Sequence, residues 1–91
     1  MKLKFFATYR EFTRCKEEDV RAPHDVWELL VSLGERYGAG FKDKLLTPDG
    51  MEVGDETIIL VNGRDIYHLS GKNTLLTEID TVSIFPMVAG G

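Results

Sequence analysis

Residues 25–38, which read DVWELLVSLGERYG, decide the fold. Apolar side chains recur at positions 26, 29, 30, 33 and 37. This spacing of i, i+3, i+4, i+7 and i+11 is typical of an amphipathic helix. Asp25 is the predicted N-cap, Glu28 is its capping-box partner, and Gly38 suits the left-handed position after the last turn. The sequence therefore predicts one long helix whose single apolar face must pack against another layer.

The sequence predicts strands both before and after this helix. Residues 2–9 (KLKFFATY) alternate like a strand, and a short second strand is expected at 19–22, before Pro23. Residues 57–61 (TIILV) predict a buried strand, and Asn62-Gly63 predicts a hairpin turn into a return strand at 64–67. Residues 81–88 form the last predicted strand. Residues 10–16 are expected to be a charged, solvated connection, and residues 41–46 one further helical turn.

This order of elements predicts an α+β fold in which a mixed sheet of four to five strands carries one main helix across one face. The 91 residues suit a single domain spanning residues 1–91. No apolar run approaches the roughly 20 residues of a membrane span. No secretory signal is evident either, so a cytoplasmic location is expected.

Charge and cysteine content exclude several classes of function. The net charge is −4 and the sequence pI is near 5.1, which argues against general nucleic-acid binding. The single cysteine, Cys15, excludes an internal disulfide and any site built from several thiolates. The two histidines have no Cys or carboxylate cluster around them in the sequence. We therefore expect no metal site, no bound cofactor and no catalytic residue on this chain.

The faces of the first and last strands point to a protein contact. If Val82 and Ile84 face the helix, then Phe85 and Met87 face solvent, and the same alternation leaves Phe6 outside. Should the two strands be neighbours, Phe6, Phe85 and Met87 form an exposed apolar patch, which usually marks a protein interface. The alternative is that residues 38–54 fold over the patch. Arg64, beside the hairpin turn, is either a contact for an acidic group of a partner or a plain surface residue.

The last eight residues, IFPMVAGG, run from an apolar strand straight into two glycines. We expect residues 88–91, which are Val88, Ala89, Gly90 and Gly91, to form a flexible tail that threads into a partner. Glycine has no Cβ and therefore suits a narrow channel. Four extended residues reach roughly 13 Å.

Several motifs together resemble the small subunit of molybdopterin synthase and its relatives, the ubiquitin-like β-grasp sulfur carriers and archaeal-type small modifiers. They are ILVNG at 59–63, the ending DxVSIFPxVAGG at 80–91, FFA at 5–7 with Arg10-Glu11, and the helix ELLxxLxERYG at 28–38. The resemblance covers nearly the whole chain. Two positions depart from the family pattern, because Ile79 stands where the family often has Gly and Met87 where it often has a second Pro.

The resemblance implies that the chain is a protein co-substrate, a non-catalytic small subunit of molybdopterin synthase. A ubiquitin-activating-type enzyme would use ATP and Mg to adenylate Gly91, and a sulfur donor would then convert it to a thiocarboxylate. The larger synthase subunit would use that sulfur to make the molybdenum or tungsten cofactor. Two alternatives stay open, a modifier joined to lysines through Gly91, and a sulfur carrier for thiamine, cysteine or tRNA thiolation. Neither nucleic acid nor a membrane is an expected partner.

Overall fold

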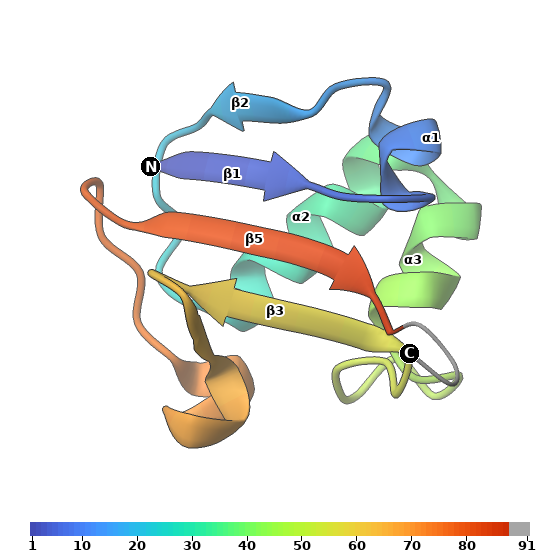
Figure 1. Ribbon diagram of the computed structural model, residues 1–91. Helices are drawn as coiled ribbons and strands as arrows, with labels where there is room; N and C mark the ends of the chain where they lie inside the picture. Colours follow the sequence, from blue (N-terminus) through green and yellow to red (C-terminus); the bar gives the residue numbers. More distant parts are fainter. Residues whose placement is uncertain (88–91) are drawn as a thin grey trace.

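The computed structural model describes residues 1–87, and the predicted tail at 88–91 lies outside the described residues. Five strands form one mixed sheet in the order β2-β1-β5-β3-β4. β1 (Lys2–Phe5) and β5 (Thr81–Pro86) are parallel neighbours, and β3 (Thr57–Val61) lies antiparallel to β5. Figure 1 looks onto the open face of this sheet, with the helices behind it. The structure therefore confirms the predicted mixed sheet. It also shows that the first and last strands are neighbours, which the sequence left open.

The main helix, α2 (Val26–Tyr37), lies where the sequence predicts it. The Asp25 carboxylate accepts the N–H of Glu28 over 2.9 Å, which confirms the N-cap. Gly38 has φ 97° and ψ 176°, so it takes a positive φ outside the left-handed helical region that was predicted. α3 (Ala39–Leu45) begins directly after it, and these seven residues replace the single predicted turn.

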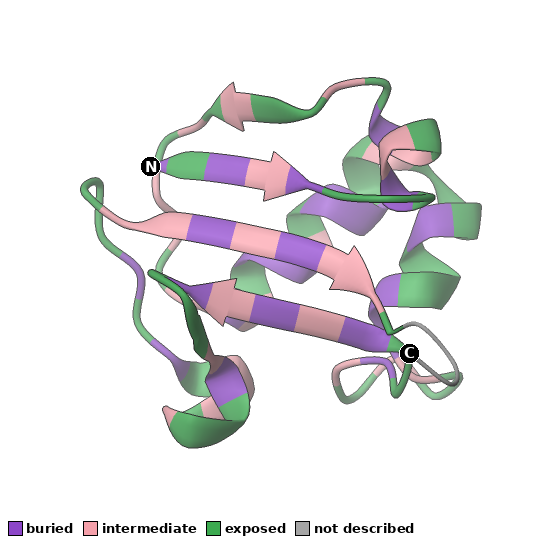
Figure 2. Ribbon diagram, in the orientation of Figure 1, coloured by how far each residue is buried: buried purple, intermediate pink, exposed green. Residues whose placement is uncertain are grey.

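The core lies between the sheet and the helices. Buried and less buried residues alternate along β1, β3 and β5, so only one face of the sheet is fully covered (Figure 2). Most of this core consists of buried apolar residues of the three strands and of α2 and α3: Leu3, Phe5, Val26, Leu29, Leu30, Leu33, Phe41, Leu45, Ile59, Val61, Val82 and Ile84. Burying this apolar face is what fixes the register of the strands.

The first predicted strand is too long, and the connection after it was predicted wrongly. Strand pairing stops at Phe5, since Ala7 turns the chain with φ 52°. Residues Tyr9–Thr13 then form a short helix, α1, in which Tyr9 and Thr13 are buried. The four-residue spacing of these two side chains gives the segment an inward face despite its charges. β2 follows at Glu17–Asp19, two residues before the predicted second strand.

The hairpin at the other edge of the sheet is confirmed. Asn62 and Gly63 have φ values of 52° and 83°, as the tight turn of a two-residue hairpin requires. The return strand, β4 (Arg64–Asp65), is shorter than predicted because the Asp65 carboxylate caps a 3-10 turn, η1 (Ile66–His68). A second 3-10 turn, η2 (Gly71–Asn73), precedes β5, which ends at Pro86, before the predicted limit at 88.

Candidate docking site at the end of the last strand

The parallel pairing of β1 and β5 brings two aromatic side chains together on the open face of the sheet. The rings of Phe6 and Phe85 meet edge to face, with centroids 5.8 Å apart and planes at 80°. Phe6 is 36% exposed and Phe85 is half-buried. Two of the three predicted patch residues are therefore in contact with each other.

Both rings line an apolar groove of about 310 Å³. Only Ser83 brings a polar side chain to its lining, which consists of Phe6, Ala7, Leu60, Ser83, Phe85 and Pro86. None of residues 38–54 lines the groove, so the alternative that this segment covers the patch is wrong. The groove is an apolar surface that the described part of the chain leaves open to solvent, and such surfaces typically receive another molecule.

Met87, the third predicted patch residue, lies just past the groove. Its side chain is 56% exposed and does not line the groove, but the preceding residue, Pro86, does. The backbone N–H of Met87 donates to the carbonyl of Glu56 over 2.6 Å. This bond holds the chain at the corner of the sheet until residue 87. Val88, Ala89, Gly90 and Gly91, the predicted threading and reactive residues, lie outside the described residues.

Arg64 does not join this patch. It pairs with Val61 at the hairpin end of β3, whereas Phe85 pairs with Ile58 near the other end. Three residues along a strand separate these positions by roughly 10 Å. Directly opposite residues of an antiparallel pair share a face. Arg64 therefore lies on the same face of the sheet as Val61, which points towards the core and away from the groove. Any contact that Arg64 makes with a partner is separate from the groove.

The prediction from sequence missed Arg10 and Leu60 as parts of this surface. Arg10 Nε donates to the carbonyl of Phe5 over 2.9 Å, and its guanidinium carbon lies 5.5 Å from the centre of the Phe6 ring. No signal in the sequence marked Arg10, because Ala7 turns the chain between Phe6 and the start of α1 at Tyr9. Leu60 was hidden because residues 57–61 are apolar on both faces, so their sequence gives no alternation.

A buried polar network anchors the corner of the sheet beside the groove. Tyr9 Oη lies 2.7 Å from Thr57 Oγ1, and Thr57 Oγ1 donates to the carbonyl of Lys44 over 2.6 Å. Since the Thr57 proton points to Lys44, the Tyr9 hydroxyl is the donor in the first bond. Burial raises the pKa of Tyr9. Thr57 is the first residue of β3, so this network ties β3 to α1 and α3. Its strand partner is Pro86, the last residue of β5.

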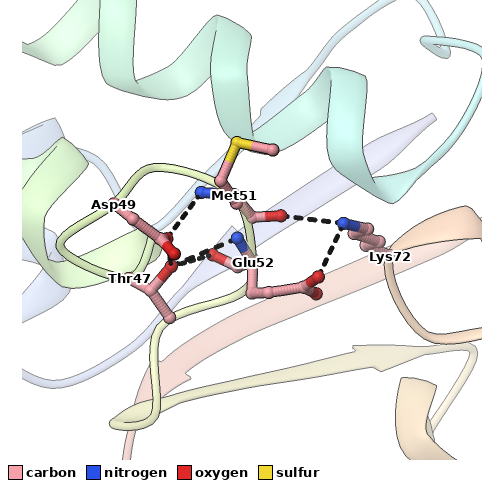
Figure 3. A network of polar contacts seen from close by, with 5 residues as sticks. All are labelled: Thr47, Asp49, Met51, Glu52 and Lys72. Atoms are coloured by element: carbon pink, nitrogen blue, oxygen red, sulfur yellow. Dashed lines mark hydrogen bonds and ion pairs between the residues drawn. The ribbon is translucent and has the colours of Figure 1, made fainter.

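A second hollow, of about 610 Å³, lies between α2, α3 and the turn at residues 47–52. Figure 3 shows a network of polar contacts beside this hollow, which includes three of its lining residues, Asp49, Met51 and Lys72. Lys72 Nζ donates to the Met51 carbonyl over 2.7 Å and to Glu52 over 3.0 Å. The Asp49 carboxylate accepts from the Thr47 hydroxyl and the Met51 N–H, and these bonds lower the Asp49 pKa. The network braces the 47–52 turn against η2.

Residues 1–87 contain no group of three His, Cys, Asp or Glu side chains placed to hold a metal ion. Within the same residues, no helix has the length and apolar character needed to cross a bilayer.

Three known proteins are similar to this chain in sequence or in structure. Small archaeal modifier protein 3 of Haloferax volcanii is 42% identical over 93 residues, which cover 100% of this chain and 98% of the relative. The solution structure of small archaeal modifier protein 1 from Methanosarcina acetivorans is 33% identical, with a TM-score of 0.84 over 99% of this chain and 94% of that one. A putative molybdopterin converting factor, subunit 1, from Pyrococcus furiosus is 27% identical, with a TM-score of 0.73 over 96% and 95% of the two chains.

The ThiS family matches residues 3–91, which is nearly the whole chain. The sheet order, the helix across one face and the similarity to solved modifiers all agree with that match. The chain belongs to the ThiS family and is a ubiquitin-like β-grasp protein, close to the small archaeal modifiers, in a family of protein modifiers and sulfur carriers.

Proposed function

We propose that this chain is a ubiquitin-like carrier whose folded body is inert and whose Gly91 carboxylate is the reacting group. A ubiquitin-activating-type enzyme adenylates that carboxylate, and the activated acyl group then passes to an acceptor. The observation that carries the proposal is the apolar groove beside the end of β5, from which the chain continues through Met87 to its last four residues.

The chemistry explains why an activating partner is needed. A terminal carboxylate has a pKa near 3.5 and is ionised at neutral pH, so it is a poor electrophile. In the adenylation step, a carboxylate oxygen attacks the α-phosphorus of ATP and pyrophosphate leaves. The product is a mixed anhydride, which a nucleophile opens with release of AMP. Mg and ATP belong to the partner in this scheme.

The groove supplies the docking surface that such a reaction requires. It places Phe6, Phe85 and Leu60 on one open face, and aromatic side chains are favoured at the centre of protein interfaces. Four extended residues after Met87 reach roughly 13 Å, far enough to bring Gly91 from this corner into a cleft of the docked enzyme. The same face then serves the activating enzyme and the acceptor in turn.

A role as a protein modifier is favoured by two relatives, 42% and 33% identical to this chain, because both are named as small archaeal modifiers. In this branch a lysine amine of a target protein attacks the activated Gly91 carbonyl. An isopeptide bond forms, and the activating group leaves.

The second branch is a sulfur carrier for molybdopterin synthesis. It is favoured by the 27% identity to the putative molybdopterin converting factor subunit and by the FPxV ending in the sequence. In this branch a sulfur donor displaces AMP, and the Gly91 thiocarboxylate gives its sulfur to a pterin precursor on a larger synthase subunit.

Mass spectrometry of cells that express the chain with and without Gly91 separates these branches. The last tryptic site is Lys72, so a modifier leaves residues 73–91 attached to target lysines after trypsin. A sulfur carrier instead yields a free chain with one terminal oxygen replaced by sulfur, and it restores molybdoenzyme activity in cells that lack it. Finding neither product with the intact chain contradicts the proposed function.

A further inference from the structure

We propose that Arg10 and the apolar groove form one composite docking site, and that its occupant is a segment of the activating enzyme in which a carboxylate stands next to an apolar side chain. The inference rests on the proposed function and names the chemistry of its partner. The apolar side chain enters the groove that Phe6 and Phe85 line, and the carboxylate meets the outer nitrogens of Arg10.

The position of Arg10 is fixed by two contacts within its own domain. Its Nε donates to the Phe5 carbonyl over 2.9 Å, and its guanidinium lies against the Phe6 ring, 5.5 Å from the centroid. The side chain is half-buried, so part of its rotamer entropy is already lost before a partner arrives. An arginine held in this way presents a planar fork of donors beside an aromatic ring.

The outer nitrogens of Arg10 have no carboxylate partner in residues 1–87. The described ion pairs involve other cations, and the only hydrogen bond from the Arg10 side chain comes from Nε. A guanidinium stacked on an aromatic ring and partly removed from water gains most from a bidentate carboxylate. Arginine beside exposed aromatic residues is also the composition of an interface hot spot.

The charges around the groove favour an acidic partner at this margin, although the whole chain carries a net charge of −4. Lys4 stands beside Ser83 in the pairing of β1 with β5, so a second cation borders the same side of the groove. Glu17, the partner of Lys4 in β2, already forms an ion pair with Lys2 over 3.6 Å. On the opposite side, the Asp65 carboxylate is engaged by the N–H of Tyr67. The cations lie on the β1 side, and an approaching carboxylate is therefore guided to Arg10.

The test measures ATP–pyrophosphate exchange by the purified adenylating enzyme as the concentration of this chain is varied. Arg10→Gln is expected to raise KM about tenfold with kcat unchanged, because one charge-assisted contact is lost. It should also flatten the rise of KM with salt, since an ion pair is removed. Arg10→Lys keeps the positive charge but loses the planar guanidinium, so its KM should lie between those of the wild-type chain and Arg10→Gln. Arg21→Gln removes an exposed arginine near Glu78 and is the matched control, with KM unchanged.

Thermal unfolding of each variant separates docking from folding. An Arg10→Gln chain that melts at a lower temperature but keeps the wild-type KM and salt dependence overturns the inference, because Arg10 then only supports the fold. A wild-type chain that dimerises in sedimentation, with Arg10→Gln monomeric, also overturns it, since the groove then holds a second copy. No exchange with the wild-type chain contradicts the proposed function itself, and this inference falls with it.

Discussion

Phe6 and Phe85 come from the two ends of the chain and meet edge to face, with ring centroids 5.8 Å apart on the open side of the sheet. They meet because β1 and β5 are parallel neighbours in the centre of the sheet. Their contact lies next to Pro86, the last residue of β5. The pairing of β1 with β5 therefore lies within the sheet and also brings together residues that line the groove.

Replacing Phe6 by Ala is expected to weaken docking of the activating enzyme much more than folding. The ring is 36% exposed, so losing the aromatic pair should cost about 0.5–1.5 kcal/mol of unfolding free energy. Loss of an interface aromatic should raise the dissociation constant at least about tenfold. Calorimetric titration and urea unfolding measure the two effects. Ile79→Ala is the matched control, because Ile79 is 92% exposed and does not line the groove, and it should change neither value.

Replacing Thr57 by Val is expected to destabilise the corner of the sheet. The change keeps the shape of the side chain but leaves the Tyr9 hydroxyl and the Lys44 carbonyl without their partner. Leaving such buried groups unpaired should cost about 1–3 kcal/mol in urea unfolding. Tyr9→Phe removes only the outer bond of the network and should cost less. Equal losses of unfolding free energy in Thr57→Val and Tyr9→Phe would contradict a network in which Thr57 links the other two groups.

Replacing Asp80 by Asn is expected to change the acid sensitivity of the fold. The Asn62 side-chain amide and the Thr77 N–H both donate to the Asp80 carboxylate over 2.8 Å, and the bond from Asn62 is the main cause of its lowered pKa. A carboxylate whose pKa is lower in the folded state stabilises the fold above its unfolded pKa. That contribution is lost as pH falls through the folded pKa.

The unfolding free energy of the wild-type chain should therefore decline as pH falls below about 4, and less steeply in Asp80→Asn. Asp55→Asn removes the same charge from an exposed residue whose side chain forms no hydrogen bond within residues 1–87, and serves as the control. Parallel declines in the wild-type chain and Asp80→Asn would rule out a role for this carboxylate.

Elements of the fold were predictable where the residue pattern is typical of only one structure. The amphipathic spacing of α2 and its Asp25 cap define that helix, and Asn62-Gly63 defines the hairpin. The contact of Phe6 with Phe85 was predicted only on the condition that the first and last strands are neighbours, and the structure meets that condition.

Local features that depend on tertiary contacts were not predictable in the same way. The charges of residues 10–16 concealed α1, whose inward face rests on only Tyr9 and Thr13. Ala7 adopts a positive φ that its residue type does not favour, so nothing in the sequence marked the end of β1 there. Arg10 became part of the candidate site only once its contacts with Phe5 and Phe6 were visible.

The central claim is that a folded but inert domain presents its Gly91 carboxylate for adenylation. The most direct measurement incubates the chain with the purified activating enzyme, ATP and Mg, and detects the acyl-adenylate by mass spectrometry. A chain lacking Gly91 and a chain extended by one residue are run beside it, each checked for native folding by circular dichroism. We predict the adenylate on the intact chain alone. An equal yield of adenylate on either altered chain, or none on the intact chain, would contradict the account.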